Sequence, residues 1–335
     1  MRSSADVNDA AVKGTADDAI TGKLSAVTLG YFDDPFLVHF SKPAPGQPSR
    51  RPPIINRGNF ARMACVDKVV RAFCGCEALS GDKQLLPPSH LPPPLAPSSP
   101  STTIPPLETT PQVVSLGAGN DTTFFRLARD SAAPRGGYFE IDFPSTMERK
   151  LATLLRSPPL RQLAPLTQTQ TLSQSDGDLR DANGVVRALL AAGLDPQAPT
   201  LLVAECVLVY MEPAESAALL AELSGNFPCR SVMRNNIRAR GCRLPGFDPF
   251  PSLGAHVARL NAAGYSSAQA LDMLTAYERV LDAAQVARAA RIEPLDEVEE
   301  WTLIMSHYCL ALAARGEQAE QFLQSLKLPA PLVRT

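Results

Sequence analysis

Apolar positions in residues 113–223 alternate between short continuous runs and stretches with helical spacing. The continuous runs predict buried strands at 113–116, 138–141 and 200–210. Helical spacing predicts helices at 122–128, 144–155, 182–192 and 212–223. Strands that alternate with helices are typical of a parallel sheet with helices on both faces. We therefore expect an α/β, doubly wound, mostly parallel sheet.

The rest of the chain has different patterns on either side of this region. A helix is expected to start at Thr15 as N-cap, and another covers 59–73. The C-terminal third predicts helices at 251–263, 267–277, 282–290 and 295–305, then a strand at 307–314. Residues 79–112 contain ten prolines and no periodic apolar pattern. This divides the chain into an N-terminal helical cap (1–78), a disordered proline-rich insert (79–112), a core (113–316) and a tail (317–335).

A glycine-rich turn follows the first expected strand of the core. Gly117 and Gly119 are separated by one residue, a helix follows, and Asp142 comes at the end of the next strand. This layout predicts a nucleoside pocket, in which glycines allow close approach and the acid accepts hydrogen bonds from a ribose. Thr122 occupies the place of the third glycine of a dinucleotide fingerprint, which favours S-adenosylmethionine (SAM) over NAD. An ordinary strand–turn–helix remains the alternative.

Three acids fall at or near the ends of expected strands: Asp142, Asp178 and Glu205. Ligands of open α/β sheets bind at this edge, so the acids could surround a cofactor. The alternative for Glu205, within an apolar run, is a core carboxylate with a satisfied partner. No metal-ligand spacing and no nucleophile–histidine pattern is evident, which favours chemistry that depends on positioning.

Charge and cysteine content narrow the class of protein. A net charge of -2 argues against a nucleic-acid or anionic-membrane surface. The seven cysteines are irregularly spaced, as expected for reduced thiols of a cytoplasmic protein. The first residues lack the apolar segment of a signal peptide, and no apolar run has the length of a membrane span.

Several blocks of sequence resemble one enzyme family, the leucine carboxyl methyltransferases. The resemblance covers residues 12–316 and is strongest in VVSLGAGNDTTFFRL (113–127), YFEIDFP (138–144) and LLVAECVLVYM (201–211). It implies a Rossmann-like seven-strand SAM-methyltransferase sheet with an N-terminal helical cap and no metal. It also implies an activity: esterification by SAM of the C-terminal leucine α-carboxylate of the protein phosphatase 2A catalytic subunit, a type 2A enzyme.

The resemblance assigns one group of residues to the amino-acid end of SAM and to the protein substrate. Lys23 and Arg62 would hold the methionine carboxylate, and Glu205 would bind the methionine amine. Tyr210 would face the substrate and act as the catalytic residue.

A second group is assigned to the nucleoside. Gly117 would lie at the close-approach turn and Asp142 would bind the ribose, while Asp178 and Leu179 would border the adenine. We expect all of these side chains to share one cavity.

The sequence departs from the family near residues 226–236, where about fifteen residues are missing by comparison with the family pattern. The sheet could therefore lack a strand near 230, and two alternatives stay open. One is a catalytically impaired SAM-fold protein that binds the phosphatase tail. The other is the tRNA wybutosine-type carboxyl methyltransferase paralogue, which carries a long C-terminal repeat domain that is not expected in a chain of 335 residues.

Overall fold

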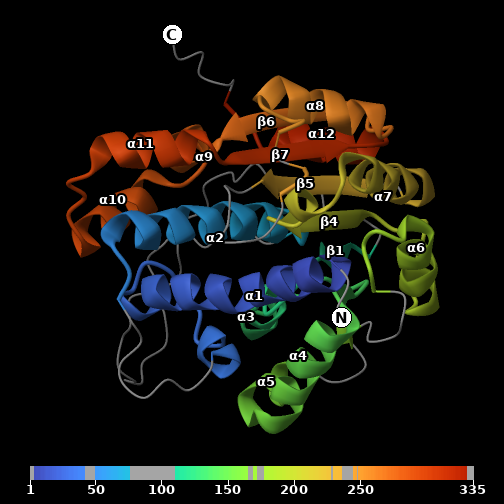
Figure 1. The fold of residues 1–335 in the computed structure, drawn as a ribbon, viewed down its shortest axis with the longest axis horizontal. Coiled ribbons are helices and arrows are strands. Elements are labelled where there is room, and N and C mark those ends of the chain that lie inside the picture. The colour runs from blue at the N-terminus through green and yellow to red at the C-terminus, as the bar shows by residue number, and fades with distance from the viewer. Residues whose placement is uncertain are drawn as a thin grey trace, which may run out of the picture.

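Seven strands form one sheet in the order β3–β2–β1–β4–β5–β7–β6 (Figure 1). The computed structural model describes residues 4–41, 50–75, 110–164, 169–171, 177–227, 229–235, 244–246 and 248–329. Residues 79–109 of the expected proline-rich insert (79–112) lie outside the described residues. The strands are β1 (Gln112–Leu116), β2 (Tyr138–Ile141), β3 (Thr169–Thr171), β4 (Thr200–Glu205), β5 (Cys229–Asn235), β6 (Ser267–Asp272) and β7 (Cys309–Ala314).

Strand direction determines where a ligand can bind. The first five strands run parallel: β1 pairs with β2 and β4, β2 with β3, and β4 with β5. β7 is antiparallel to both β5 and β6. The predicted α/β class with a mostly parallel sheet is confirmed. The carboxyl ends of β1, β2 and β4 therefore meet at one edge.

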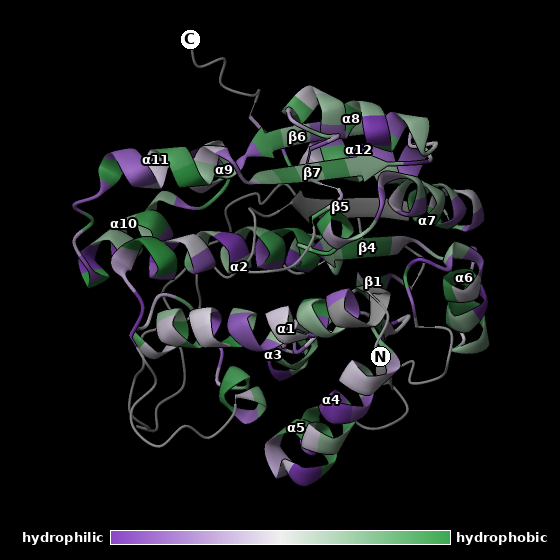
Figure 2. Ribbon diagram, viewed as in Figure 1, coloured by the Kyte–Doolittle hydropathy of each residue, from purple (hydrophilic) through white to green (hydrophobic). Residues whose placement is uncertain are grey.

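Helices cover both faces of the sheet. The helices after the cap are α3 (Thr123–Arg129), α4 (Pro144–Arg156), α5 (Pro158–Leu163), α6 (Ala182–Ala191), α7 (Pro213–Asn226), α8 (Leu253–Ala262), α9 (Met273–Arg279), α10 (Ala283–Ile292), α11 (Val298–Ser306) and α12 (Glu317–Ser325). Successive strand residues enter opposite layers: Val113 packs in the cluster that contains Phe60 of the cap, and Val114 packs with Leu189 and Leu219. Figure 2 shows that strands β4 and β7 are largely hydrophobic, whereas the helices around them carry both hydrophilic and hydrophobic residues.

The N-terminal cap consists of α1 (Ser4–Thr28), the short 3-10 helix η1 (Leu37–Phe40) and α2 (Pro53–Phe73). Helices α1 and α2 lie side by side across the sheet (Figure 1). The expected helix start at Thr15 is wrong, because the helix begins eleven residues earlier. The Thr15 hydroxyl donates to the carbonyl of Val12 at 2.6 Å, an intrahelical contact rather than a cap.

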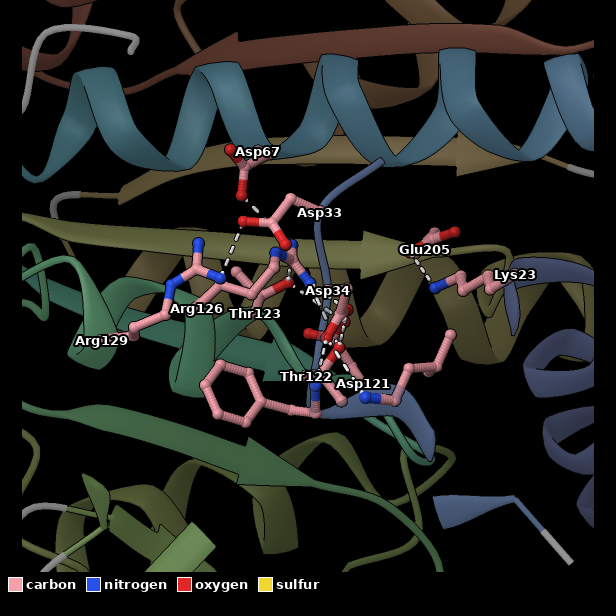
Figure 3. Close-up of polar contacts among 12 residues, drawn as sticks. Lys23, Asp33, Asp34, Asp67, Asp121, Thr122, Thr123, Arg126, Arg129 and Glu205 are labelled. Atoms are coloured by element: carbon pink, nitrogen blue, oxygen red, sulfur yellow. Dashed lines mark hydrogen bonds and ion pairs between the residues drawn. The ribbon is translucent and has the colours of Figure 1, made fainter. Parts of the chain in front are cut away.

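A buried ion-pair cluster joins this cap to the core (Figure 3). The Arg126 guanidinium on α3 contacts Asp34 at 2.9 Å and Asp67 of α2 at 3.1 Å. Its side chain is 4% exposed and that of Asp34 is 0% exposed. Thr122, directly after the glycine turn, also bonds Asp34. The cap is therefore fixed to the segment that forms the turn.

Two expectations for the C-terminal third are wrong. The helix expected at 267–277 is instead strand β6 followed by helix α9, and Asp272 caps that helix by accepting from Thr275 N at 2.6 Å. The tail expected after residue 316 contains helix α12, whose Ala319 and Leu323 are buried in the core.

The expected strand at 200–210 is shorter than predicted. β4 ends at Glu205, and residues Leu208–Tyr210 form the 3-10 helix η2. The strand in doubt near residue 230 is present as β5, paired with β4 on one side and β7 on the other. Glu205 therefore lies at the end of a strand and not inside it.

Some features are absent from the described part of the chain. No helix there is long and apolar enough to cross a membrane. The same part of the chain contains no group of three or more His, Cys, Asp or Glu side chains that could hold a metal ion. The described cysteines Cys65, Cys74, Cys206 and Cys309 form no disulfide.

Candidate functional site

A cavity of about 890 Å³ opens at the carboxyl edge of β1, β2 and β4. Its walls are the glycine turn, the loops after β2 and β4, and the inner faces of α1 and α2. All eight residues predicted from the sequence line it: Lys23, Arg62, Gly117, Asp142, Asp178, Leu179, Glu205 and Tyr210. The expectation that these residues share one cavity is confirmed, whereas the role of each remains a prediction.

The glycine turn is held tightly against its neighbours. Gly117 has φ +62°, and its N–H donates to Ile141 O at 2.8 Å. A Cβ at Gly117 would lie 2.4 Å from a methyl carbon of Val207. The Gly119 N–H donates to Asp142 Oδ2 at 2.8 Å. Only glycine fits at 117, and the turn is bonded directly to the acid of the next strand.

Asp142 lies at the end of β2 with its carboxylate among backbone donors. Besides Gly119, the Phe143 N–H donates to Oδ1 at 2.6 Å. Burial raises the pKa of Asp142 above its ordinary value, although these two N–H groups act to lower it. A carboxylate in this place can accept hydrogen bonds from ribose hydroxyls.

Two cations meet one carboxylate at the opposite part of the cavity. Lys23 Nζ on α1 lies 3.1 Å from Glu205 Oε2, and Arg62 Nε on α2 lies 2.9 Å from Glu205 Oε1. Figure 3 shows Lys23 and Glu205 directed toward each other at the end of β4. Burial opposes the charge of Arg62, but Glu205 outweighs it and raises the pKa of Arg62. The group carries a net positive charge, which suits a ligand with both a carboxylate and an amine.

Two ion pairs of Arg180 join α1 to the loop that carries Asp178. Arg180 contacts Asp9 of α1 at 2.9 Å and Asp178 at 2.6 Å. Burial acts against the ionised form of Asp178, but the bonds from Arg180 lower its pKa overall. Lys13 of α1 lies 4.7 Å from the centre of the Phe143 ring. Helix α1 therefore forms one wall of the nucleoside side of the cavity.

Tyr210 and an apolar wall lie on the remaining side. Tyr210 is half-buried in η2, five residues beyond Glu205. Cys206 between them has φ +58°, a left-handed conformation that turns the chain sharply after the strand. The apolar wall comes from the end of η2 and from α11, with residues Met211, Ile304 and Met305. This part of the cavity suits a substrate with an apolar side chain.

Sequence reasoning missed several lining residues. Asp9, Lys13 and Arg180 contribute charge, and Phe143 contributes a ring. Phe143 follows Asp142 directly in the sequence, so its place in the cavity wall could have been inferred from that of Asp142. The residues on α1 could not, because the helix was expected to start only at Thr15.

A model of the leucine carboxyl methyltransferase family matches residues 107–224. Leucine carboxyl methyltransferase 1 of Bos taurus is 34% identical over 345 residues, which cover 93% of this chain and 92% of that protein. The Arabidopsis thaliana homolog of the same protein is 32% identical, over 91% and 90% of the two chains. The chain belongs to the leucine carboxyl methyltransferase family. The tRNA wybutosine-synthesizing protein 4 of Homo sapiens is 33% identical over 92% of this chain, but over only 44% of that protein.

Membership of the leucine carboxyl methyltransferase family makes this chain a SAM-dependent methyltransferase that acts on a carboxyl group. The cavity fits the co-substrate SAM in size, since small-molecule sites have volumes of about 300–1,000 Å³. It also fits in charge, with an acid beside the glycine turn and a cation-rich group at the other end. SAM supplies an electrophilic methyl group when it is bound.

Replacement of Gly117 by alanine is expected to lower the free energy of unfolding by about 2–4 kcal/mol, because the methyl group meets Val207 and the backbone has a positive φ. Gly119→Ala is the matched control. Its φ is +50°, but its nearest neighbour would be Ala16 Cβ at 3.6 Å. Only backbone strain of about 1 kcal/mol is expected there. Urea unfolding compares the two, and equal losses would contradict the close packing at Gly117.

Proposed function

We propose that this enzyme transfers the methyl group of SAM to the α-carboxylate of the C-terminal leucine of the protein phosphatase 2A catalytic subunit. The observation that carries the proposal is the similarity to the cattle protein named leucine carboxyl methyltransferase 1, which extends over more than nine-tenths of both chains. Tyr210 and the apolar wall from η2 and α11 support it, because they offer a place for a leucine side chain in the cavity that the cations also line.

The chemistry needs no general base. A C-terminal α-carboxylate has a pKa of about 3.5, so it is already ionised at neutral pH. One of its oxygens attacks the methyl carbon as the carbon–sulfur bond breaks, and the sulfonium becomes a neutral thioether. The protein contributes alignment and exclusion of water. We assign Lys23, Arg62 and Glu205 to the amino-acid end of SAM, and Tyr210 to the substrate side.

The nucleoside assignments follow from the other end of the cavity. Asp142 and the Gly117 turn are proposed to hold the ribose, and Asp178 with Leu179 to border the adenine. The α1 helix contributes to this pocket through Asp9, which shares Arg180 with Asp178.

A tRNA substrate is the second candidate, favoured by the 33% identity to the human wybutosine-synthesizing protein 4. Against it, the chain has a net charge of -2, whereas a surface that binds RNA gathers positive charge. A catalytically impaired relative that only binds the phosphatase tail was considered because a strand near 230 was in doubt. The presence of β5 answers the doubt about the strand, and the assay of methyl transfer tests whether the enzyme is active despite the shorter sequence in this region.

Methyl transfer from radiolabelled SAM tests the proposal. The enzyme is incubated with the phosphatase 2A catalytic subunit, with the same subunit lacking its terminal leucine, and with bulk tRNA. Incorporation that requires the leucine is the expected result. Label in tRNA would favour the second candidate, and binding of the subunit without transfer would indicate an impaired enzyme.

A further inference from the structure

A buried lysine lies behind the nucleoside side of the cavity. Lys150 of α4 is 3% exposed, and its partner Glu140 of β2 is 2% exposed. The lysine Nζ lies 2.7 Å from Glu140 Oε2 and 2.8 Å from Oε1. It also donates to the carbonyl of Asp121 at 2.7 Å. Lys150 does not line the cavity and none of the assigned roles uses it.

The contacts of Lys150 reach both structures that would hold a ribose. Asp121 is the last residue of the turn that begins at Gly117, so the bond to its carbonyl fixes the far end of that turn. Glu140 is in β2 and Asp142 directly follows that strand, so the ion pair of Lys150 with Glu140 holds the chain two residues before the acid. Lys150 thus connects the turn and the acid from behind.

Charge around Asp142 is unbalanced without this lysine. Glu140 is a second carboxylate that interacts with Asp142, the Asp121 carboxylate acts in turn on Glu140, and Lys150 is a buried cation that acts on both Glu140 and Asp142. The other cation that acts on Asp142 is Arg149, which is exposed on α4. Interactions with water screen an exposed charge much more than a buried one. Most of the compensation therefore comes from Lys150.

We propose that Lys150 is a positioning residue for SAM: it fixes the end of the glycine turn and offsets the negative charges of Glu140 and Asp142. The inference rests on the proposed contact between Asp142 and the ribose of SAM. An ionised Asp142 can accept from the turn and from ribose hydroxyls at once, whereas a protonated one loses acceptor capacity.

The sign of the pH effect follows from the surroundings of Asp142. Burial already raises its pKa, and Lys150 lowers it. Without the lysine the pKa of Asp142 rises further, as does that of Glu140. Nucleoside affinity is then present at high pH and is lost as pH falls through the raised pKa of Asp142.

Calorimetric titration with S-adenosylhomocysteine, the product of the reaction, tests this between pH 6 and pH 8. For Lys150→Met we expect the ratio of variant to wild-type Kd to be larger at pH 6 than at pH 8, by up to about tenfold for each unit by which the pKa of Asp142 rises above 6. Taking the ratio cancels the titration of the ligand amine, which is common to both proteins. A ratio that stays constant with pH would overturn the proposal. So would a ratio that is larger at pH 8, because an unpaired Glu140 is ionised there and would damage the structure most at that pH.

Three further variants separate the possible causes. Glu140→Gln keeps the hydrogen bond from Lys150 to the Asp121 carbonyl and removes an anion near Asp142. For this variant, the ratio of variant to wild-type Kd should be no larger at pH 6 than at pH 8. The double variant with Lys150→Met and Glu140→Gln leaves no unpaired buried charge. The double variant repeats the test if Lys150→Met fails to fold. Its ratio of variant to wild-type Kd should again be larger at pH 6 than at pH 8, by a smaller factor. The same ratio at both pH values would overturn the proposal. Asp142→Asn should weaken binding at every pH, and full affinity in that variant would disprove the ribose contact itself.

Discussion

Replacement of Arg126 by methionine is expected to lower the free energy of unfolding by about 3–5 kcal/mol, the cost of breaking a buried ion pair from one side. The guanidinium contacts Asp34 and Asp67 and donates to Thr122 and Thr123. Its pKa is raised because these acids outweigh the effect of burial. Methionine fills part of the space but leaves Asp34, which is fully buried, without its cation.

Arg129→Met on the same helix is the matched control. Arg129 lies three residues further along α3 and contacts Asp33, whose side chain is 80% exposed. It also contacts Asp130, which would keep Arg71 as a cation in the variant. Pairs as exposed as the one with Asp33 contribute about 0–1 kcal/mol. Urea unfolding of both variants measures the difference. A loss for Arg126→Met no larger than that for Arg129→Met would show that the cluster does not join the cap to the core.

The glycine turn and its acids could be predicted from the sequence because their signals are local. The continuous apolar run predicts a strand, the glycines at 117 and 119 predict a turn, and the acid at 142 marks the end of the next strand. None of these signals depends on distant parts of the chain. The parallel sheet then brings separate strand ends to one edge. This is why Asp142 and Glu205, which are 63 positions apart, line the same cavity.

Strand β6 could not be predicted in this way. Residues 267–272 contain alanine, glutamine and leucine, which favour a helix. They form a strand because all six pair with β7, which is itself paired with β5 on its other side. Tertiary pairing overrides local propensity here, as it does in β5, where polar residues lie between two other strands.

The predictions for the two ends of the chain were wrong for a related reason. Thr15 is a good N-cap residue, but the chain before it is already helical. Residues 317–335 were expected to form a tail, but they contain helix α12. It is stabilised by burying Ala319 and Leu323, and nothing in the segment itself shows which surface will cover them.

Replacement of Arg62 by methionine is expected to weaken the binding of SAM by about 2–4 kcal/mol, or roughly 30- to 1,000-fold in Kd. The variant removes one of two cations beside Glu205, so the group changes from a net positive charge to neutral. Attraction for the carboxylate of SAM is lost, while the acid that would bind the amine remains. Isothermal titration calorimetry measures the change, with Lys68→Met on the same helix as control because its pair with Asp282 is partly exposed.

A second ligand locates the effect within the cavity. 5′-Methylthioadenosine has the nucleoside and the sulfur of SAM but lacks the amino-acid part. If Arg62 binds that part, the Arg62→Met variant should bind methylthioadenosine as the wild type does. Asp142→Asn should weaken both ligands, because both carry the ribose. Equal losses for the two ligands in Arg62→Met would mean that the arginine maintains the shape of the cavity and does not contact the carboxylate of SAM.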